Sequence, residues 1–354
     1  TLNRDIMSPI GKYTANYDSS SGSMGLKRTG FNPAILASPI AAQLGGYLNS
    51  LNSYEQAFNN LDMRMNYDNQ TRNAFKFANK YANAGNTTVY SPTYLQEKNA
   101  GIWFKPYVSY ESVGLKNGPK VDNTLYGAYF GGDSPVYSFK NGVDMQYSLY
   151  AGYNGSHQSY TDTGIYQNGG ILGATALLYK DNFFTALTLN AGAFGDASTK
   201  YGNEDFTTFS TGVASKTGYN IEFADGKFIV QPSMLLSYTF VNTFDYTNAA
   251  GVRIDADPIH AINISPGLKF IGNLGNGWQP YFGARMIWNI LDKADYYAND
   301  VSLPSLSVKP YVQYGFGVQK LWGERSTGFA QFMVRNGGRN GIAFNVGYRY
   351  ALGK

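Results

Sequence analysis

The sequence contains no cysteine and only two histidines among its 354 residues. The first absence excludes disulfides and thiolate metal sites, and two histidines are too few for a histidine-rich metal centre. Charged residues make up 15% of the chain, against about 25% in soluble domains. Since no apolar run reaches about 18 residues, a transmembrane helix is excluded. The net charge of +4 comes without a basic run, so we expect no nucleic-acid partner.

What the chain has instead is glycine and aromatic residues: 41 Gly, 30 Tyr, 22 Phe and 4 Trp. This composition excludes intrinsic disorder. It is typical of strands with one face toward lipid and the other toward water. The first residues lack both an initiator methionine and a signal-peptide pattern, so we expect either a removed signal peptide or the C-terminal fragment of a longer protein.

The first 100 residues differ in pattern from the remainder. Residues 1–33 are rich in Ser, Gly and Asn and are predicted to be a flexible tether or passenger remnant. Residues 34–100 are predicted to be a helical linker or plug, with helices over 34–65 and 71–82 and a loop over 83–100. The first helix carries an apolar stripe at spacings of three and four, made of Ile40, Leu44, Tyr47, Leu51, Tyr54, Phe58, Leu61 and Met65.

This stripe predicts a packing partner. Each large apolar side chain gains about 1.5–3 kcal/mol when buried, and a lumen lined by Lys, Arg, Gln and Asn would offer no such burial. We therefore expect the second helix, through Phe75, Phe77 and Tyr81, to complete a helical hairpin that plugs or caps one mouth. The alternative is an oligomer in which another copy covers the stripe.

From residue 101 to 354 the period changes to two. In 307–321, for example, Val312, Tyr314 and Phe316 alternate with Gln313 and Gly315. We count twelve such segments, at 102–113, 123–138, 143–157, 165–180, 183–199, 205–223, 228–246, 259–273, 278–291, 307–321, 326–336 and 341–351. Short turns alternate with longer loops at 114–122, 158–164, 247–258 and 292–306. The fold class is therefore an all-β membrane protein, a 12-stranded antiparallel transmembrane β-barrel preceded by a helical segment.

A soluble sandwich or propeller is the alternative fold. Its strands average about five or six residues, whereas these segments are mostly longer than ten. Aromatic residues near the strand ends also fit the girdles of a membrane barrel; they are Trp103, Trp278, Trp288, Trp322 and Tyr350.

Charged residues in the strands should face the lumen, because a charge facing lipid costs about 2–4 kcal/mol near the midplane. The candidate lumen-facing residues are Lys105, Glu111, Lys216, Lys269, Arg285, Lys309, Arg335 and Arg349, with Asp133 and Glu222 as further acids. They either line a solvated lumen or hold an inserted segment that carries Glu55, Asp62 and Asp68. The excess of cations predicts that an open lumen would favour anions.

Catalytic chemistry has little support in the sequence. His157 and His260 map to the outer strand ends, and Asp255 and Asp257 precede His260, which is the minimum for general-base catalysis. No second motif accompanies them. Asp255-Ala256-Asp257 also lacks the further oxygen ligands that Ca²⁺ needs. We therefore expect no enzyme activity, no cofactor and no metal site.

The C-terminal segment resembles the translocator domain of autotransporters (type V secretion). The resemblance rests on Lys309-Pro310-Tyr311-Val312, Gly315-Phe316-Gly317-Val318, Trp322-Gly323-Glu324-Arg325 and Gly338-Arg339-Asn340-Gly341. The chain departs from the family at its end, where Ala351–Lys354 follow the aromatic Tyr350.

The resemblance implies a protein of the cell outer membrane of a diderm, Gram-negative-type bacterium that anchors or exports an N-terminal passenger. Its partners would be outer-membrane lipid, the barrel assembly machinery and its own passenger. The alternatives are a porin-like channel with a helical plug and a protease or lipase at the rim.

Overall fold

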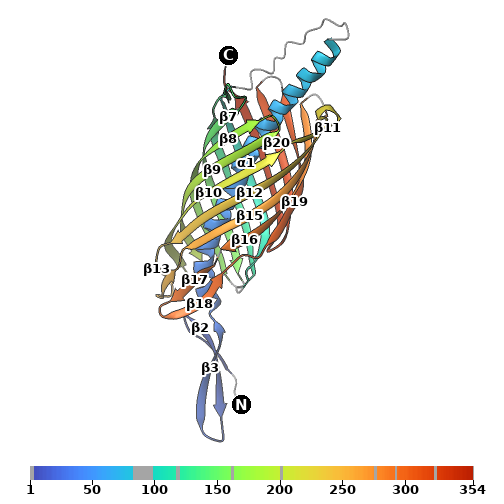
Figure 1. Ribbon diagram of the computed structural model, residues 1–354. Helices are drawn as coiled ribbons and strands as arrows, with labels where there is room; N and C mark the ends of the chain where they lie inside the picture. The colour runs from blue at the N-terminus through green and yellow to red at the C-terminus, as the bar shows by residue number, and fades with distance from the viewer. Residues whose placement is uncertain are drawn as a thin grey trace.

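Twelve long strands form one closed antiparallel barrel (Figure 1). The computed structural model describes residues 4–82, 99–116, 120–160, 163–199, 202–274, 277–291, 293–322 and 325–353. The barrel strands are β4 (Gly101–Gly114), β5 (Lys120–Asp133), β7 (Asp144–Tyr160), β8 (Thr163–Lys180), β9 (Phe183–Thr199), β10 (Gly202–Tyr219), β12 (Phe228–Thr243), β15 (Ile259–Gly272), β16 (Trp278–Leu291), β19 (Tyr311–Trp322), β20 (Ser326–Gly337) and β21 (Arg339–Ala351). The barrel closes because β21 pairs with β4, and β10 pairs with both β9 and β12.

The strands alternate between an apolar outer face and a buried inner face. In β4, for example, Phe104 and Tyr110 are exposed whereas Lys105 and Glu111 are buried. This alternation is what lipid outside and a polar, filled interior require. Trp278, Trp288 and Trp322 are exposed on the outer face. Trp103 was expected in the same girdle, but it is buried, and its ring lies 4.9 Å from the Lys105 ammonium.

The longer connections carry short strands of their own. The two-residue strand β6 (Tyr137–Ser138) pairs with β7, and β11 (Ile221–Phe223) pairs with β12 ahead of the 3-10 turn η2 (Ala224–Gly226). A separate four-stranded sheet combines β13 (Tyr246–Thr247), β14 (Arg253–Ala256), β17 (Ala294–Ala298) and β18 (Val301–Leu306). Two predicted loops, 247–258 and 292–306, thus supply most of this sheet, which lies at the end of the barrel opposite the C-terminus (Figure 1).

The N-terminal segment is also more ordered than its composition predicted. Strands β1 (Arg4–Met7), β2 (Gly11–Asp18) and β3 (Ser23–Phe31) form a three-stranded sheet beyond the same end of the barrel (Figure 1). The prediction of a flexible tether is therefore wrong for these residues. Most of β3 is exposed. No buried face therefore imposes the alternation of apolar and polar residues by which a strand is recognised in a sequence.

A single helix, α1 (Pro33–Ala82), replaces the predicted helical hairpin. No Gly or Pro lies between Gly46 and Ala82, so nothing in the chain stops the helix near residue 66. It enters at the N-terminal sheet, runs through the lumen and projects from the far end (Figure 1). The capping hairpin is thus wrong, and a threaded linker takes its place. Of the loop predicted over 83–100, residues 83–98 lie outside the described residues. Among the described helices, none is long and apolar enough to cross a membrane.

Candidate functional site: the helix-filled lumen

The apolar stripe of α1 is buried against the inner wall of its own barrel. Ile40, Leu44 and Tyr47 share one cluster with inward residues that include Ile165 and Phe194. Further along the helix, the partners of Tyr54, Phe58 and Leu51 are Leu177, Tyr179, Phe184, Ala186, Ala214 and Leu235. The expectation that the lumen offers no apolar burial is therefore wrong, and so is the oligomer through this stripe. Nothing is described for the side chains of Leu61 and Met65.

Glycines on both partners allow the helix to lie close to the wall. A Cβ added to Gly45 would overlap the amide of Gln167, and one added to Gly212 would overlap the hydroxyl of Tyr54. Gly45 has a low intrinsic helix propensity, but its missing side chain lets α1 approach β8. The Gln167 amide in turn donates to the carbonyl of Ala42 over 3.2 Å.

The stripe tyrosines combine apolar rings with paired hydroxyl groups. The Tyr47 hydroxyl lies 3.0 Å from Asn263 Oδ1 and 3.2 Å from Asn289 Oδ1. The Tyr54 hydroxyl lies 3.1 Å from Thr239 Oγ1. A lumen of mixed chemistry suits such side chains, since their bodies are apolar and their tips are polar.

One carboxylate of the helix is bound by two lysines of the wall. Asp62 Oδ2 accepts hydrogen bonds from Lys216 Nζ on β10 and Lys269 Nζ on β15, each over 2.6 Å. Asp62 and Lys216 are almost fully buried. Charges this far from water are stable only when paired, so this contact fixes the position of α1 along the lumen.

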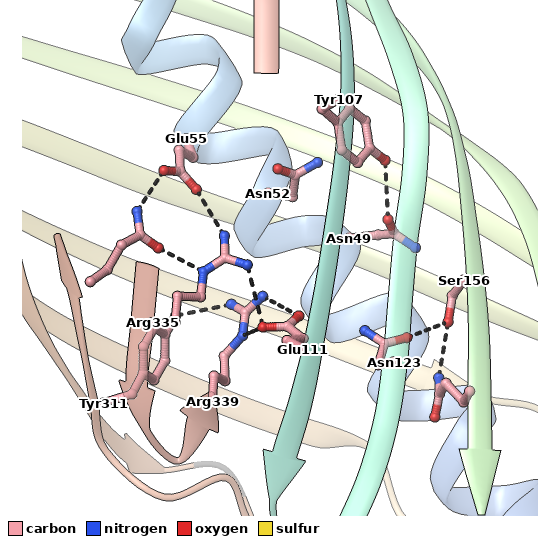
Figure 2. A network of polar contacts seen from close by, with 12 residues as sticks. Asn49, Asn52, Glu55, Tyr107, Glu111, Asn123, Ser156, Tyr311, Arg335 and Arg339 are labelled. Carbon is pink, nitrogen blue, oxygen red and sulfur yellow. Dashed lines mark hydrogen bonds and ion pairs between the residues drawn. The ribbon is translucent and has the colours of Figure 1, made fainter. Parts of the chain in front are cut away.

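A second ionic network joins the helix to β4, β19, β20 and β21 (Figure 2). Glu55 accepts from Gln313 over 2.6 Å and is paired with Arg335 over 3.5 Å. Arg335 also reaches Glu111 at 3.3 Å, and Arg339 donates to both oxygens of Glu111 at 2.6 and 2.7 Å. Glu111 thus pairs with two buried arginines, and one of them, Arg335, also pairs with Glu55 of the helix.

Lys105 holds the helix through its backbone. Its Nζ donates to the carbonyl of Gln56 over 2.9 Å and lies 4.9 and 5.3 Å from the rings of Trp103 and Phe329. An internal helix carbonyl already accepts one bond from within the helix, and its second lone pair is free for such a donor. Elsewhere on the wall, Arg349 pairs with Asp133 over 2.9 Å.

Comparison with known proteins agrees with this architecture. A family profile described as the autotransporter β-domain matches residues 102–332, more than half of the chain. The chain belongs to the autotransporter β-domain family. A comparison with curated protein sequences found no match.

Solved structures similar to this autotransporter β-domain share its fold at low sequence identity. The transport unit of the autotransporter AIDA-I from Escherichia coli is 15% identical with a TM-score of 0.60, covering 75% of this chain and 93% of its own. The β-domain of the Bordetella autotransporter BrkA is 18% identical with a TM-score of 0.58, covering 72% and 100%. The NalP translocator domain from Neisseria meningitidis is 12% identical with a TM-score of 0.57, covering 72% and 89%.

The predicted lumen residues of this autotransporter lie mostly where the alternation puts them. Lys105, Glu111, Lys216, Arg335 and Arg349 are buried on the inner face, and Lys269 and Arg285 are half-buried there. The prediction that Lys309 faces the lumen is wrong. This residue is exposed on the segment before β19, which begins two residues later.

Sequence reasoning missed Arg339, because it placed this residue in a turn. Arg339 is instead the first residue of β21. It shares the odd-numbered, inward parity of Arg349, and that signal could have identified it.

The candidate catalytic groups do not converge. His260 is exposed on the outer face and bonded to the Tyr238 hydroxyl, while Asp255 is paired with Arg253. His157 stacks on the ring of Tyr166. Within the described ranges, no three His, Asp or Glu side chains are grouped as a metal site would require.

Proposed function

We propose that this chain is the translocator and surface anchor of an autotransporter, and that α1 is the linker left in the pore after an N-terminal passenger has crossed. The observation that carries the proposal is α1 itself, which occupies the lumen from end to end (Figure 1). The family membership supports the same role. A porin-like channel fits less well, because the helix fills the space that a solute would need.

The lengths of the longest connections support a direction for the helix. The two longest connections between barrel strands, 244–258 and 292–310, lie away from the end that holds the C-terminus. Long loops are extracellular in bacterial barrels, so the C-terminal end is periplasmic. The opposite end, with β1–β3 and the β13–β14–β17–β18 sheet, is then the cell surface. In this orientation α1 connects the surface to the periplasm.

We further propose outer-membrane lipid and the barrel assembly machinery as partners. Most of the long strands carry exposed large apolar side chains on the outer face, and in β21 exposed Phe344, Tyr348 and Tyr350 continue it to the C-terminal end. The domain division that follows is a surface segment up to residue 33, a linker from 34 to 100 and a barrel from 101 to 354. No step in this function requires a catalytic group.

A peptide-tag experiment tests the orientation. We expect a tag inserted after Ser20, in the exposed turn between β2 and β3, to bind antibody on intact cells. The matched control is the same tag after Asn141, in a short turn at the other end, which should bind only after the outer membrane is permeabilised. The reverse pattern, or two equally accessible tags, would contradict the proposal.

A further inference from the structure

Two small cavities lie between α1 and the wall formed by β12, β15, β16 and β19. Their volumes are about 50 and 40 Å³. Arg285 lines both of them. Glycines at positions 267, 283 and 315 of the surrounding strands open the smaller cavity, because they put no side chains into it. Each volume exceeds the roughly 10–15 Å³ that one water needs.

Arg285 differs from the other inward cations of the described chain. Lys216 and Lys269 share Asp62, Arg335 and Arg339 share Glu111, Arg349 pairs with Asp133, and Lys105 bonds to a helix carbonyl. No carboxylate of the described residues lies within ion-pair distance of Arg285. Its guanidinium is half-buried and carries five N–H donors with no acceptor of its own.

Two serine hydroxyls line the larger cavity together with Arg285. Ser237 on β12 and Ser265 on β15 are 5% and 3% exposed. Neither hydroxyl has a hydrogen-bond partner among the described residues. A buried hydroxyl without a partner is uncommon, and a hydroxyl can rotate to donate to an anion.

The charge around the cavities is positive. Five cations, Lys216, Lys269, Arg285, Arg335 and Arg339, line them, and one carboxylate, Glu55, lines both cavities. Together with the buried Asp62 and Glu111, three carboxylates pair with four of these cations. Of the two surplus positive charges, one belongs to the two lysines around Asp62 and the other is that of Arg285. In surroundings of low dielectric, a cation without a counter-charge attracts an anion strongly.

We propose that a small inorganic anion of halide size binds in the larger cavity, held by the guanidinium of Arg285 and the hydroxyls of Ser237 and Ser265. Leu51 and Tyr54 of α1 form the opposite side of this cavity. The anion therefore touches both the wall and the linker, and its binding favours the state in which the helix is inserted. This is a ligand site that the secretion function does not require.

Bromide is the probe for the test. Crystals of the full chain grown in sodium bromide should give an anomalous peak within contact distance of the Arg285 guanidinium and Ser265 Oγ. Arg285→Gln should remove that peak. Peaks confined to surface lysines would mean an adventitious ion only and would overturn the proposal, as would a peak that survives in Arg285→Gln.

A solution measurement covers the case in which Arg285→Gln does not fold. At constant ionic strength, replacing gluconate by bromide should slow hydrogen exchange of the α1 amides, by about tenfold when bromide is ten times its Kd. Ser265→Ala, a smaller change, should weaken this dependence. Equal exchange rates in bromide and gluconate for the parent chain would contradict the site.

Discussion

Replacing Asp62 with Asn is expected to loosen α1 in the lumen more than any other single change in the helix. The substitution keeps the shape of the side chain but removes the negative charge that Lys216 and Lys269 share at 2.6 Å. The buried ammonium group of Lys216 and the half-buried one of Lys269 then lose their only carboxylate among the described residues. Breaking a buried ion pair in this way costs about 3–5 kcal/mol, so the ratio of released to inserted helix should rise by a factor of about 200 to 5,000.

Hydrogen exchange of the α1 amides in membrane-embedded protein measures this change. Exchange between Gln43 and Asn60 should accelerate in Asp62→Asn while exchange in the barrel strands stays as it was. Asp295→Asn is the matched control, because Asp295 forms an exposed pair with Lys293, and such pairs contribute about 0–1 kcal/mol. Unchanged helix exchange in Asp62→Asn would show that this contact does not hold the linker.

Replacing Glu111 with Gln is expected to weaken the barrel itself. Glu111 is fully buried and receives Arg339 on both oxygens and Arg335 on one. It connects β4 to β20 and β21 near the point where the barrel closes. With its charge removed, two buried guanidinium groups remain, and we expect the free energy of unfolding to fall by about 3–5 kcal/mol.

Denaturant titration of the protein in lipid vesicles measures that fall. The helix-specific signal separates the two variants. Asp62→Asn should accelerate helix exchange with little effect on the free energy of barrel unfolding, whereas Glu111→Gln should accelerate helix exchange and lower that free energy. Asp295→Asn again serves as the exposed control. Barrel stability equal to that of the parent chain in Glu111→Gln would contradict the role given to this network.

The twelve strands could be predicted from the sequence because lipid and lumen impose opposite demands on alternate residues. The predicted segments over 183–199 and 278–291 coincide with β9 and β16. The inward position of Lys105 or Lys216 follows from the same constraint, since neither charge can face lipid.

The path of the helix could not be predicted, because both faces of several strands are apolar. Leu177, Phe184 and Ala186 point inward, while Leu187 and Leu189 point outward. Hydrophobicity alone does not distinguish the two sides there. The inward apolar residues were therefore not recognised, and the sequence predicted no partner within the barrel for the stripe of α1.

Contacts between distant residues also lay beyond the sequence pattern. The pairing of Asp62 with Lys216 spans 154 positions, and neither residue type nor spacing reveals it. The N-terminal sheet was missed for another reason: most of β3 is exposed, so no buried face imposes a periodic pattern of apolar residues on it.

Disulfide cross-linking in native outer membranes tests most directly that α1 occupies the lumen. Ser53 on the helix contacts Asn190 on the inner face of β9, while neighbouring Leu189 is exposed on the outer face. Because the chain has no cysteine, Ser53→Cys with Asn190→Cys gives one defined pair, and oxidation should yield a single linked peptide by mass spectrometry. Ser53→Cys with Leu189→Cys, the control, should yield none. A linked peptide in the control, or none in the first pair, would contradict a helix threaded through the barrel.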